Sequence, residues 1–344
     1  MDARAVEILM RGYRREGYSK DDCRYLLSFQ EFSPEAIFTR DLFDRYYKER
    51  CDYTASISAQ IGVYTGPCSG DCGFCNFGAS HTTSKPYEMP DDVFVSYLKD
   101  TIRFGDANDI SIMTNQDCPM DTLVHFIRLA KQTVPEDVKI LVNTGDRSLD
   151  ECKELRKAGA EIAYHVCRMG EGKDTAFDPE VRLQTIRNLI EAGFLTMTCT
   201  EPIGQEHSID DVIDDFFRGR EMGCVCGSVA MRMPVFGTPL GASPTLSIKR
   251  YHQIQAVLAL ATSDHHTDPR FSDWDVGYFA GLNSLSAELA GSPRDTGPLS
   301  EKSVGHTMAW CRRTLFGDGY DKIRKADGTV VRLDAQYLLD TGSL

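Results

Sequence analysis

The chain has 344 residues, of which 42% are hydrophobic, enough for one large core or two ordinary ones. Its formal net charge of -13 disfavours a nucleic-acid-binding surface, which is usually basic. No apolar run approaches the roughly 18 to 20 residues of a membrane helix, and the charged N-terminus shows no secretion signal. We therefore expect a cytoplasmic protein that binds neither nucleic acid nor membrane.

Residues 1–52 are predicted to form a helical prelude. The clearest helix spans 33–50, where apolar residues recur three and four apart. Ser33 is its expected N-cap, Pro34 its first helical residue, and Glu35 an acidic residue of the first turn.

Strands and helices then alternate along the chain. The first strand is the β-branched stretch "ASISAQIGVY", and strands begin near positions 55, 109, 139, 162, 195 and 227. A spacing of about 30 residues is that of one βαβ unit and favours a parallel sheet with helices outside. Around eight such units close a (β/α)8 TIM-type barrel, which we expect over residues 53–295; an open doubly wound sheet is the alternative.

The end of the barrel is less clearly patterned. We expect its last strands at "DPRFS" and "NSLSAEL". Residues 296–344 are predicted to form a C-terminal helix and a tail that covers the barrel mouth.

The stretch "PCSGDCGFCNF" places Cys68, Cys72 and Cys75 in one glycine-rich loop directly after the first strand. A structural zinc site normally has four ligands, and the nearest fourth candidate is His81. An iron–sulfur cluster held by three thiolates fits the loop better and leaves one iron with an open coordination position. The loop would lie at the C-terminal face of the barrel, where such folds build active sites.

The C-x3-C-x2-C spacing, with Phe74 before the third cysteine, resembles the radical S-adenosylmethionine (SAM) enzymes. The resemblance implies that Cys68, Cys72 and Cys75 hold a [4Fe-4S] cluster whose open iron chelates S-adenosylmethionine. One electron from the cluster would then cleave the sulfonium. The 5′-deoxyadenosyl radical that results would take hydrogen from a C–H bond, with Phe74 beside the adenine.

The resemblance continues beyond the loop. The stretches "EPIGQE", "MPVFGTPL" and "YFAGLNSL" are laid out as in the biotin synthase-like subgroup, which includes hydrogenase-maturation enzymes and methylornithine synthase. It implies a step of cofactor biosynthesis on a small molecule or a lipoyl-type acyl chain. It also implies a reductant such as flavodoxin or ferredoxin, and leaves room for a partner protein or a homodimer.

Further cofactor contacts are expected at the ends of strands. Arg182, in the first turn of a helix capped by Asp178, would bind the carboxylate of S-adenosylmethionine, as an Arg does at the corresponding place in related enzymes; a solvated surface arginine is the alternative. Arg168 and Glu171 follow the fourth strand and could reach cofactor or substrate, although their spacing is not that of the relatives.

Two other pairs of residues are assigned to the cofactor by the same resemblance. Thr114 and Asn115 end the second strand, where relatives carry a Gly-Gly-Glu-like stretch that binds the methionine amine; this chain lacks those glycines, so backbone groups would fill that role. Ile203 and Gly204 would flank the adenine, with core packing as the alternative for Ile203.

A second set of cysteines, Cys118, Cys167 and Cys199, falls at or just beyond the ends of three strands. If all three point into the barrel, they could hold a second iron–sulfur cluster that donates sulfur, as in biotin or lipoyl formation. If they are ordinary buried thiols, a carbon-skeleton rearrangement, a lyase reaction or a methylation is the better expectation.

The polar stretch that begins "GSPRDTGPL" could act as a lid over the barrel mouth or be a surface excursion. Arg294 and Asp295 are its expected substrate contacts. Two other classes of protein remain open from the sequence: a zinc-stabilised binding module and an iron–sulfur electron carrier.

Overall fold

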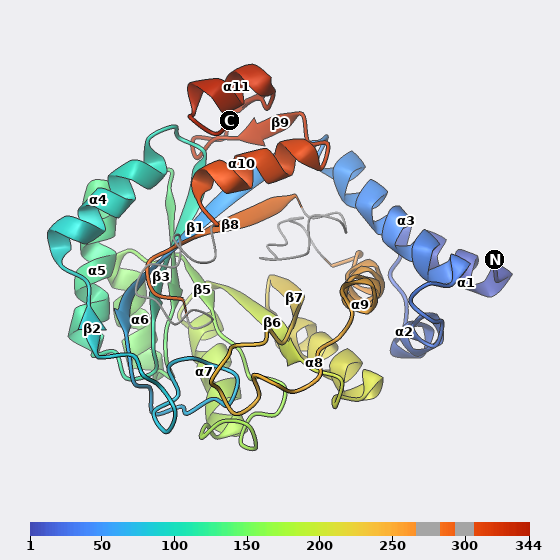
Figure 1. Ribbon diagram of the computed structural model, residues 1–344, viewed down its shortest axis with the longest axis horizontal. Coiled ribbons are helices and arrows are strands. Elements are labelled where there is room, and N and C mark those ends of the chain that lie inside the picture. The colour runs from blue at the N-terminus through green and yellow to red at the C-terminus, as the bar shows by residue number, and fades with distance from the viewer. Residues whose placement is uncertain (266–282, 293–305) are drawn as a thin grey trace.

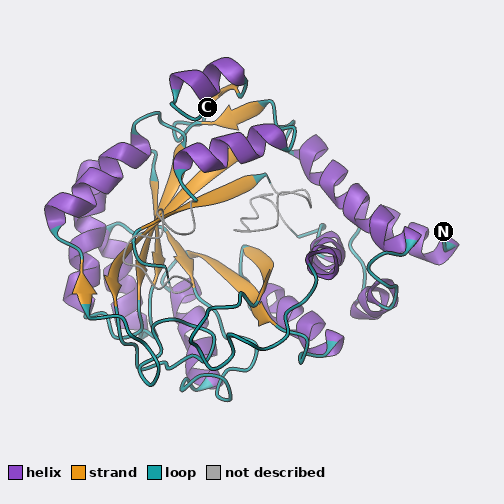
Figure 2. Ribbon diagram, viewed as in Figure 1, coloured by secondary structure: helices purple, strands orange, loops and turns teal. Residues whose placement is uncertain are grey.

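The computed structural model describes residues 1–265, 283–292 and 306–344. It shows a curled, mainly parallel sheet at the centre, with helices around its outside (Figure 1). Figure 2 shows the same separation of inner strands and outer helices. The predicted α/β fold class, a parallel sheet wrapped by helices, is therefore confirmed.

Three helices precede the sheet: α1 (Ala3–Tyr13), α2 (Lys20–Leu27) and α3 (Pro34–Arg50). The predicted cap of α3 is confirmed, because the Ser33 hydroxyl accepts a hydrogen bond from the Ala36 N–H at 3.1 Å. These helices pack against α8 (Ile209–Glu221) and α9 (Ile248–Ala261) and share a hydrophobic core with them.

Seven described strands run parallel around the barrel: β1 (Thr54–Thr65), β3 (Ala107–Thr114), β4 (Lys139–Asn143), β5 (Ile162–Tyr164), β6 (Leu195–Ile203), β7 (Cys226–Met231) and β8 (Ser284–Leu289). The helices that alternate with them before α8 are α4 (Asp91–Ile102), α5 (Met120–Thr133), α6 (Leu149–Ala158) and α7 (Pro179–Glu191). The six predicted strand starts are confirmed, and the largest difference is at β3, which begins at Ala107 rather than near 109.

The strand order is β8-β1-β3-β4-β5-β6-β7, and every neighbouring pair is parallel. The strand predicted at "NSLSAEL" is confirmed as β8, whereas the one predicted at "DPRFS" lies outside the described residues. Within the described ranges, β7 and β8 are not paired with each other. A short strand, β2 (Tyr87–Glu88), returns antiparallel to the end of β1.

Side chains alternate between the two faces of β1, as a strand requires. Its outward set is apolar and packs in the main core under the helices: Ala55, Ile57, Ala59 and Ile61. Its inward set is polar and includes Ser58 and Gln60, which line a central cavity. The inside of this barrel is therefore not filled entirely by apolar side chains.

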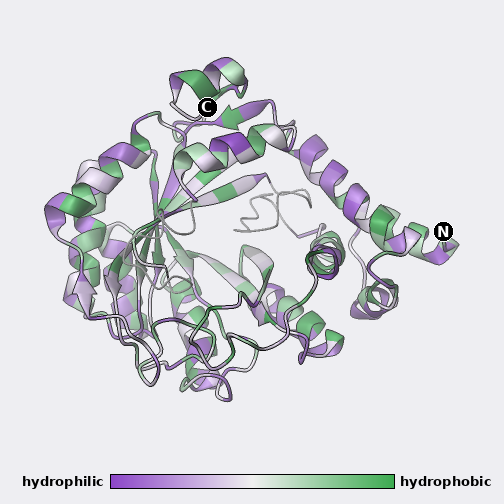
Figure 3. Cartoon of the chain, viewed as in Figure 1, coloured by the Kyte–Doolittle hydropathy of each residue, from purple (hydrophilic) through white to green (hydrophobic). Residues whose placement is uncertain are grey.

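The outer helices are amphipathic, with hydrophilic and hydrophobic residues along the same helix (Figure 3). In α5, for example, Leu123 and Ile127 are buried one turn apart, while His125 and Arg128 are exposed. None of the described helices combines the length and hydropathy that a membrane crossing requires.

The described part of the C-terminal segment consists of α10 (Met308–Gly317), β9 (Lys322–Arg324), β10 (Val330–Arg332) and α11 (Ala335–Asp340). β9 pairs with Thr54 and Ala55, the first two residues of β1. It therefore lies at the amino-terminal end of the barrel strands, opposite the mouth. Contrary to the prediction, this part of the tail does not cover the mouth.

The contact between α3 and the end of α10 yields a pH-dependent prediction. Burial raises the pKa of Asp318 to about 7, Lys48 at 3.5 Å opposes this rise, and Asp44 adds to it. Since this pKa exceeds the unfolded value of about 3.9, the stability that Asp318 contributes is complete below pH 4 and is lost as the pH rises through 7.

We expect Asp318→Asn to stabilise the fold by on the order of 2 kcal/mol more at pH 8 than at pH 5. Urea unfolding at both pH values measures the difference. An equal effect at pH 5 and pH 8 would contradict the assignment of this pH dependence to Asp318.

Candidate functional site

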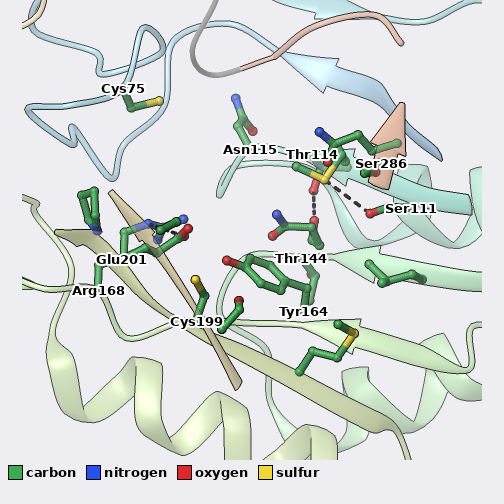
Figure 4. Close-up of a pocket in the computed structure, with 18 of the residues that line it drawn as sticks. Cys75, Ser111, Thr114, Asn115, Thr144, Tyr164, Arg168, Cys199, Glu201 and Ser286 are labelled. Carbon is green, nitrogen blue, oxygen red and sulfur yellow. Dashed lines mark hydrogen bonds and ion pairs between the residues drawn. The ribbon is translucent and has the colours of Figure 1, made fainter. Parts of the chain in front are cut away.

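A cavity of about 480 Å³ runs along the inside of the parallel strands and reaches their carboxyl ends. This is the end at which α/β barrels build active sites. The loop after β1 forms one side of the cavity, and residues from every described parallel strand form the rest. Figure 4 shows Cys75 on this loop, with Arg168 and Glu201 below it and Ser111 and Ser286 across the cavity.

Cys68, Cys72 and Cys75 all line the cavity, as the sequence predicted. The loop is folded by its own backbone: the Cys68 N–H donates to the Phe77 carbonyl at 2.7 Å and the Cys75 N–H to the Cys72 carbonyl at 3.0 Å. The Phe77 N–H donates to Cys75 Sγ at 3.3 Å. Backbone donors of this kind support thiolates that bind iron.

Two glycines make this tight loop feasible. Gly66 has a φ of +119°, a conformation that L side chains rarely adopt. At Gly70 an added Cβ would lie 2.1 Å from the ring of Phe177, so only glycine allows this contact. The glycine-rich composition of the loop therefore reflects its packing.

The thiols of Cys72 and Cys75 are neutral without a metal. Burial raises the pKa of Cys72 to about 11, although the nearby charge of Arg168 offsets part of the rise. Burial raises the pKa of Cys75 to about 12. A metal bound here would have to displace both protons, as thiolate ligation generally requires.

His81, the predicted fourth ligand of a zinc site, does not point toward the sulfur atoms. Its Nε2 lies 2.8 Å from the Cys75 carbonyl oxygen, to which it donates, and its Nδ1 lies 3.3 Å from the Ser80 hydroxyl. In the described ranges, no three His, Cys, Asp or Glu side chains are grouped to bind one metal ion. A cubane cluster needs wider spacing, because each thiolate binds a different iron.

Arg168 lies at the side of the cavity closest to the loop. Its guanidinium carbon is 6.0 Å from the ring centroid of Phe74, and its Nε is 3.7 Å from Glu201 Oε1. All three residues line the cavity. A cation, an aromatic ring and a carboxylate thus adjoin the cysteine loop, and together they could hold a charged nucleotide-like molecule.

Arg182 is 4% exposed and also lines the cavity, so the alternative of a solvated surface arginine is wrong. Its Nε donates to the Val166 carbonyl and its Nη1 to Asp146, both at 3.0 Å. Its Nε also lies 3.5 Å from Glu171. These contacts fix the guanidinium plane, which can still bind a carboxylate from the cavity side.

Asp146, just after β4, is a site residue that the sequence did not reveal. Its Oδ1 lies 3.0 Å from Arg182 Nη1 and 3.2 Å from His165 Nε2. Burial opposes ionisation, but these two neighbours hold the pKa of Asp146 below its usual value. Burial and the charge of Arg182 lower the pKa of His165 to about 4. Asp146 therefore stays ionised and orients Arg182.

Thr114 and Asn115 line the cavity, as expected from their place at the end of β3. The Asn115 side-chain amide donates to the carbonyls of Gly66 and Pro67, at 3.4 and 3.3 Å. The Thr114 hydroxyl donates to the Asn143 carbonyl at 3.2 Å. Asn115 thus secures the start of the cysteine loop.

Other predicted contacts lie outside the cavity lining. Glu171 is behind the arginines, where its carboxylate accepts from the Arg168 N–H at 2.8 Å. Ile203 is 1% exposed in the core shared with the N-terminal helices, so its packing role is confirmed. Gly204 is next to it, and an added Cβ there would lie 2.6 Å from the guanidinium of Arg232. Arg294 and Asp295 lie outside the described residues.

The second cysteine set does not converge, contrary to the expectation that all three could point into the barrel. Cys199 lines the cavity. Cys167 instead lines a small recess under α7 and α8, and Cys118 is buried in the main core. The residues past the end of a strand no longer follow its inward and outward alternation, which explains the difference.

The sequence comparisons give a consistent set of relatives, although no family model matches the chain. It is 24% identical over 231 residues to biotin synthase of Sulfurihydrogenibium sp. (strain YO3AOP1), covering 62% of this chain and 65% of that protein. It is 26% identical over 228 residues to biotin synthase of Desulforudis audaxviator, covering 62% and 66%. The chain thus spans just under two thirds of the length of these relatives.

Solved structures share the fold. Methylornithine synthase (PylB) superposes with a TM-score of 0.77 at 15% identity, covering 93% of this chain and 98% of that one. The FeFe-hydrogenase maturase HydG from Carboxydothermus hydrogenoformans gives a TM-score of 0.75 at 16% identity, covering 93% and 79%. These similarities confirm the barrel-type fold.

Proposed function

We propose that this chain, a member of the biotin synthase-like group of the radical SAM superfamily by its resemblance to those enzymes, cleaves S-adenosylmethionine reductively and removes hydrogen from a substrate C–H bond. The observation that carries the proposal is the convergence of Cys68, Cys72 and Cys75 on one cavity that also contains Arg168 and Arg182. Neither the three cysteines nor the two arginines alone would specify this chemistry.

The residues present fit a [4Fe-4S] cluster. Three thiols face one space, one of them already accepts a backbone N–H bond, and His81 is turned away. When bound, such a cluster supplies the electron that cleaves the sulfonium. Cys68, Cys72 and Cys75 would hold it, while His81, the candidate fourth ligand, is hydrogen-bonded to the Cys75 carbonyl instead.

The chain's other residues would bind and orient S-adenosylmethionine. Arg182, fixed by Asp146, would bind the carboxylate, and Phe74 would lie beside the adenine. Asn115 would fix the position of the cysteine loop relative to the strands, through its hydrogen bonds to the Gly66 and Pro67 carbonyls. The strands below would hold the substrate away from water, which protects a radical from side reactions.

We favour a reaction without sulfur insertion. Apart from the loop, Cys199 is the one cysteine among the described residues that lines the cavity, and a sulfur-donating cluster needs several thiolates. A rearrangement, a lyase reaction or a methylation of a small molecule in cofactor assembly fits this cavity better. Flavodoxin or ferredoxin would be a suitable electron donor.

The test uses the full chain, reconstituted with iron and sulfide without oxygen. We expect about four irons per chain and the release of 5′-deoxyadenosine when dithionite and S-adenosylmethionine are added. About eight irons per chain would restore the sulfur-insertion reading. A cluster-loaded protein that never releases 5′-deoxyadenosine would refute the proposed function and leave the electron-carrier reading.

Arg182 offers a more specific test. We expect Arg182→Lys to weaken S-adenosylmethionine binding about 10- to 100-fold, because lysine cannot form the paired, oriented bonds of a guanidinium to a carboxylate. Equilibrium dialysis measures the dissociation constant, and absorbance near 400 nm checks that the cluster is retained. Arg187→Lys is the matched control, since Arg187 lies on the same helix and is 48% exposed. Unchanged binding in Arg182→Lys would contradict the assigned role.

A further inference from the structure

One wall of the cavity is polar over three adjacent strands. Because β8, β1 and β3 are parallel and in register, their inward residues form two cross-strand rows. The first row is Ser286, Ser58 and Asp109, and the second is Glu288, Gln60 and Ser111. All six residues line the cavity, and Figure 4 shows Ser286 and Ser111 on the same side of it.

The second row continues across β4, β5 and β6 with apolar side chains. At this depth these strands contribute Leu141, Ile162 and Leu195 to the cavity lining. A ligand that contacts both the polar and the apolar part of this row must therefore have one part that forms hydrogen bonds and another that is hydrocarbon.

The side-chain amide of Gln60 is available to form hydrogen bonds with a ligand in the cavity. Gln60 is 7% exposed and lines the cavity, and its amide makes no side-chain hydrogen bond with the described residues. A buried amide without partners is costly, so such groups in native proteins usually face a ligand or water. Its central place in the second row puts that partner between Glu288 and Ser111.

Among the described residues, the charged groups in the two rows of this wall are carboxylates. Asp109 is 5% exposed, and its Oδ2 accepts a hydrogen bond from the Ser58 hydroxyl at 2.9 Å. Glu288 is 1% exposed, accepts from the Ser292 hydroxyl at 2.8 Å, and lies 3.6 Å from His306 Nδ1. A carboxylate oxygen accepts hydrogen bonds, so a ligand group that binds to these oxygens must be a donor.

We propose that the substrate is a small organic ammonium ion, an inference that rests on the proposed function. Its protonated nitrogen would bind at the wall of Asp109, Gln60 and Glu288. Its hydrocarbon part would lie against Ile162 and Leu195, with a C–H bond directed toward the cysteine loop. Charge-assisted hydrogen bonds of this kind are the strong ones in proteins.

Three simple probes of equal chain length test this inference: n-pentylammonium, 1-pentanol and pentanoate. Each is titrated calorimetrically into the cluster-loaded full chain with S-adenosylmethionine present. We expect n-pentylammonium to bind at least about tenfold more tightly than either other probe, as a charged hydrogen bond allows. Equal binding of n-pentylammonium and 1-pentanol, or a preference for pentanoate, would overturn the inference.

Two variants test whether the ammonium group binds at this wall. Asp109→Asn should remove most of the preference for n-pentylammonium. Asp100→Asn is the control, since it changes an exposed carboxylate of α4, and it should leave the preference unchanged. Gln60→Leu should weaken n-pentylammonium binding more than 1-pentanol binding, because the charged donor loses the stronger hydrogen bond. This variant replaces Asp109→Asn if Asp109→Asn does not fold. A preference that survives both Asp109→Asn and Gln60→Leu would place the amine elsewhere and refute the assignment.

This test and that of the proposed function fail separately. A wild-type protein that releases 5′-deoxyadenosine but does not prefer the ammonium probe would refute only the substrate class. A protein that prefers the ammonium probe but never cleaves S-adenosylmethionine would refute only the proposed function.

Discussion

Replacement of Cys72 by alanine is expected to abolish the release of 5′-deoxyadenosine, to below about one thousandth of the wild-type rate, a loss equivalent to about 4 kcal/mol in the barrier. Cys72 is 8% exposed and lies between the other two thiols of the loop. With two thiolates remaining, the cluster would lose iron or fail to assemble. Iron content and the absorbance near 400 nm should fall together with the activity.

Cys51→Ala is the matched control for this variant. Cys51 is the C-cap of α3 and does not line the cavity. The control therefore deletes the same thiol group at a position outside the site. We expect its iron content and 5′-deoxyadenosine release to equal those of the wild type. A Cys72→Ala protein that still releases 5′-deoxyadenosine at the wild-type rate would refute the assignment of the loop.

The largest effect on stability is expected at Arg312, on the opposite end of the barrel. The Arg312 guanidinium donates to both carboxylate oxygens of Asp106, at 2.7 and 2.9 Å. Tyr337 also donates to Asp106, at 2.8 Å. Asp106 is fully buried just before β3, so this pair joins α10 and α11 to the base of the sheet.

Arg312→Met is expected to lower the free energy of unfolding by about 3 to 5 kcal/mol, because it leaves the Asp106 carboxylate buried without its countercharge. Urea unfolding followed by circular dichroism measures the loss. Arg313→Met is the control, since Arg313 is exposed on the same helix, and we expect a change below about 1 kcal/mol.

A double variant distinguishes loss of the Asp106–Arg312 ion pair from loss of side-chain volume as the cause of the destabilisation. Asp106→Asn with Arg312→Met removes both charges, and we expect it to be more stable than Arg312→Met alone. If the double variant is no more stable than the single one, the loss arises from side-chain volume, and the buried charge is not its cause.

Much of the fold follows from local patterns. The strand starts and the Ser33 cap were predictable because period-two strands, helical spacing and capping residues depend on neighbours in sequence. The position of the tail was not, because β9 pairs with Thr54 and Ala55 more than 250 residues earlier. No local pattern reports such a long-range pairing.

Site residues that depend on local sequence were predictable, and those that depend on distant residues were not. The cysteine loop is contiguous, so its spacing alone predicted three thiols that face one space. Asp146 was missed because its role depends on Arg182 and His165, which come from other βα units. The polar wall did leave a signal: polar residues occupy alternate positions in "SISAQ" and "SLSAE", which predicts an inner face with hydrogen-bonding groups.

The most direct measurement is electron–nuclear double resonance on the reduced, cluster-loaded protein with S-adenosylmethionine carrying ¹⁵N in its amino group. We expect a hyperfine coupling between the cluster and the labelled nitrogen, since three cysteines leave one iron free for the amine. A cluster signal that shows no coupling to the label, or that couples instead to a histidine nitrogen such as that of His81, would contradict the central claim.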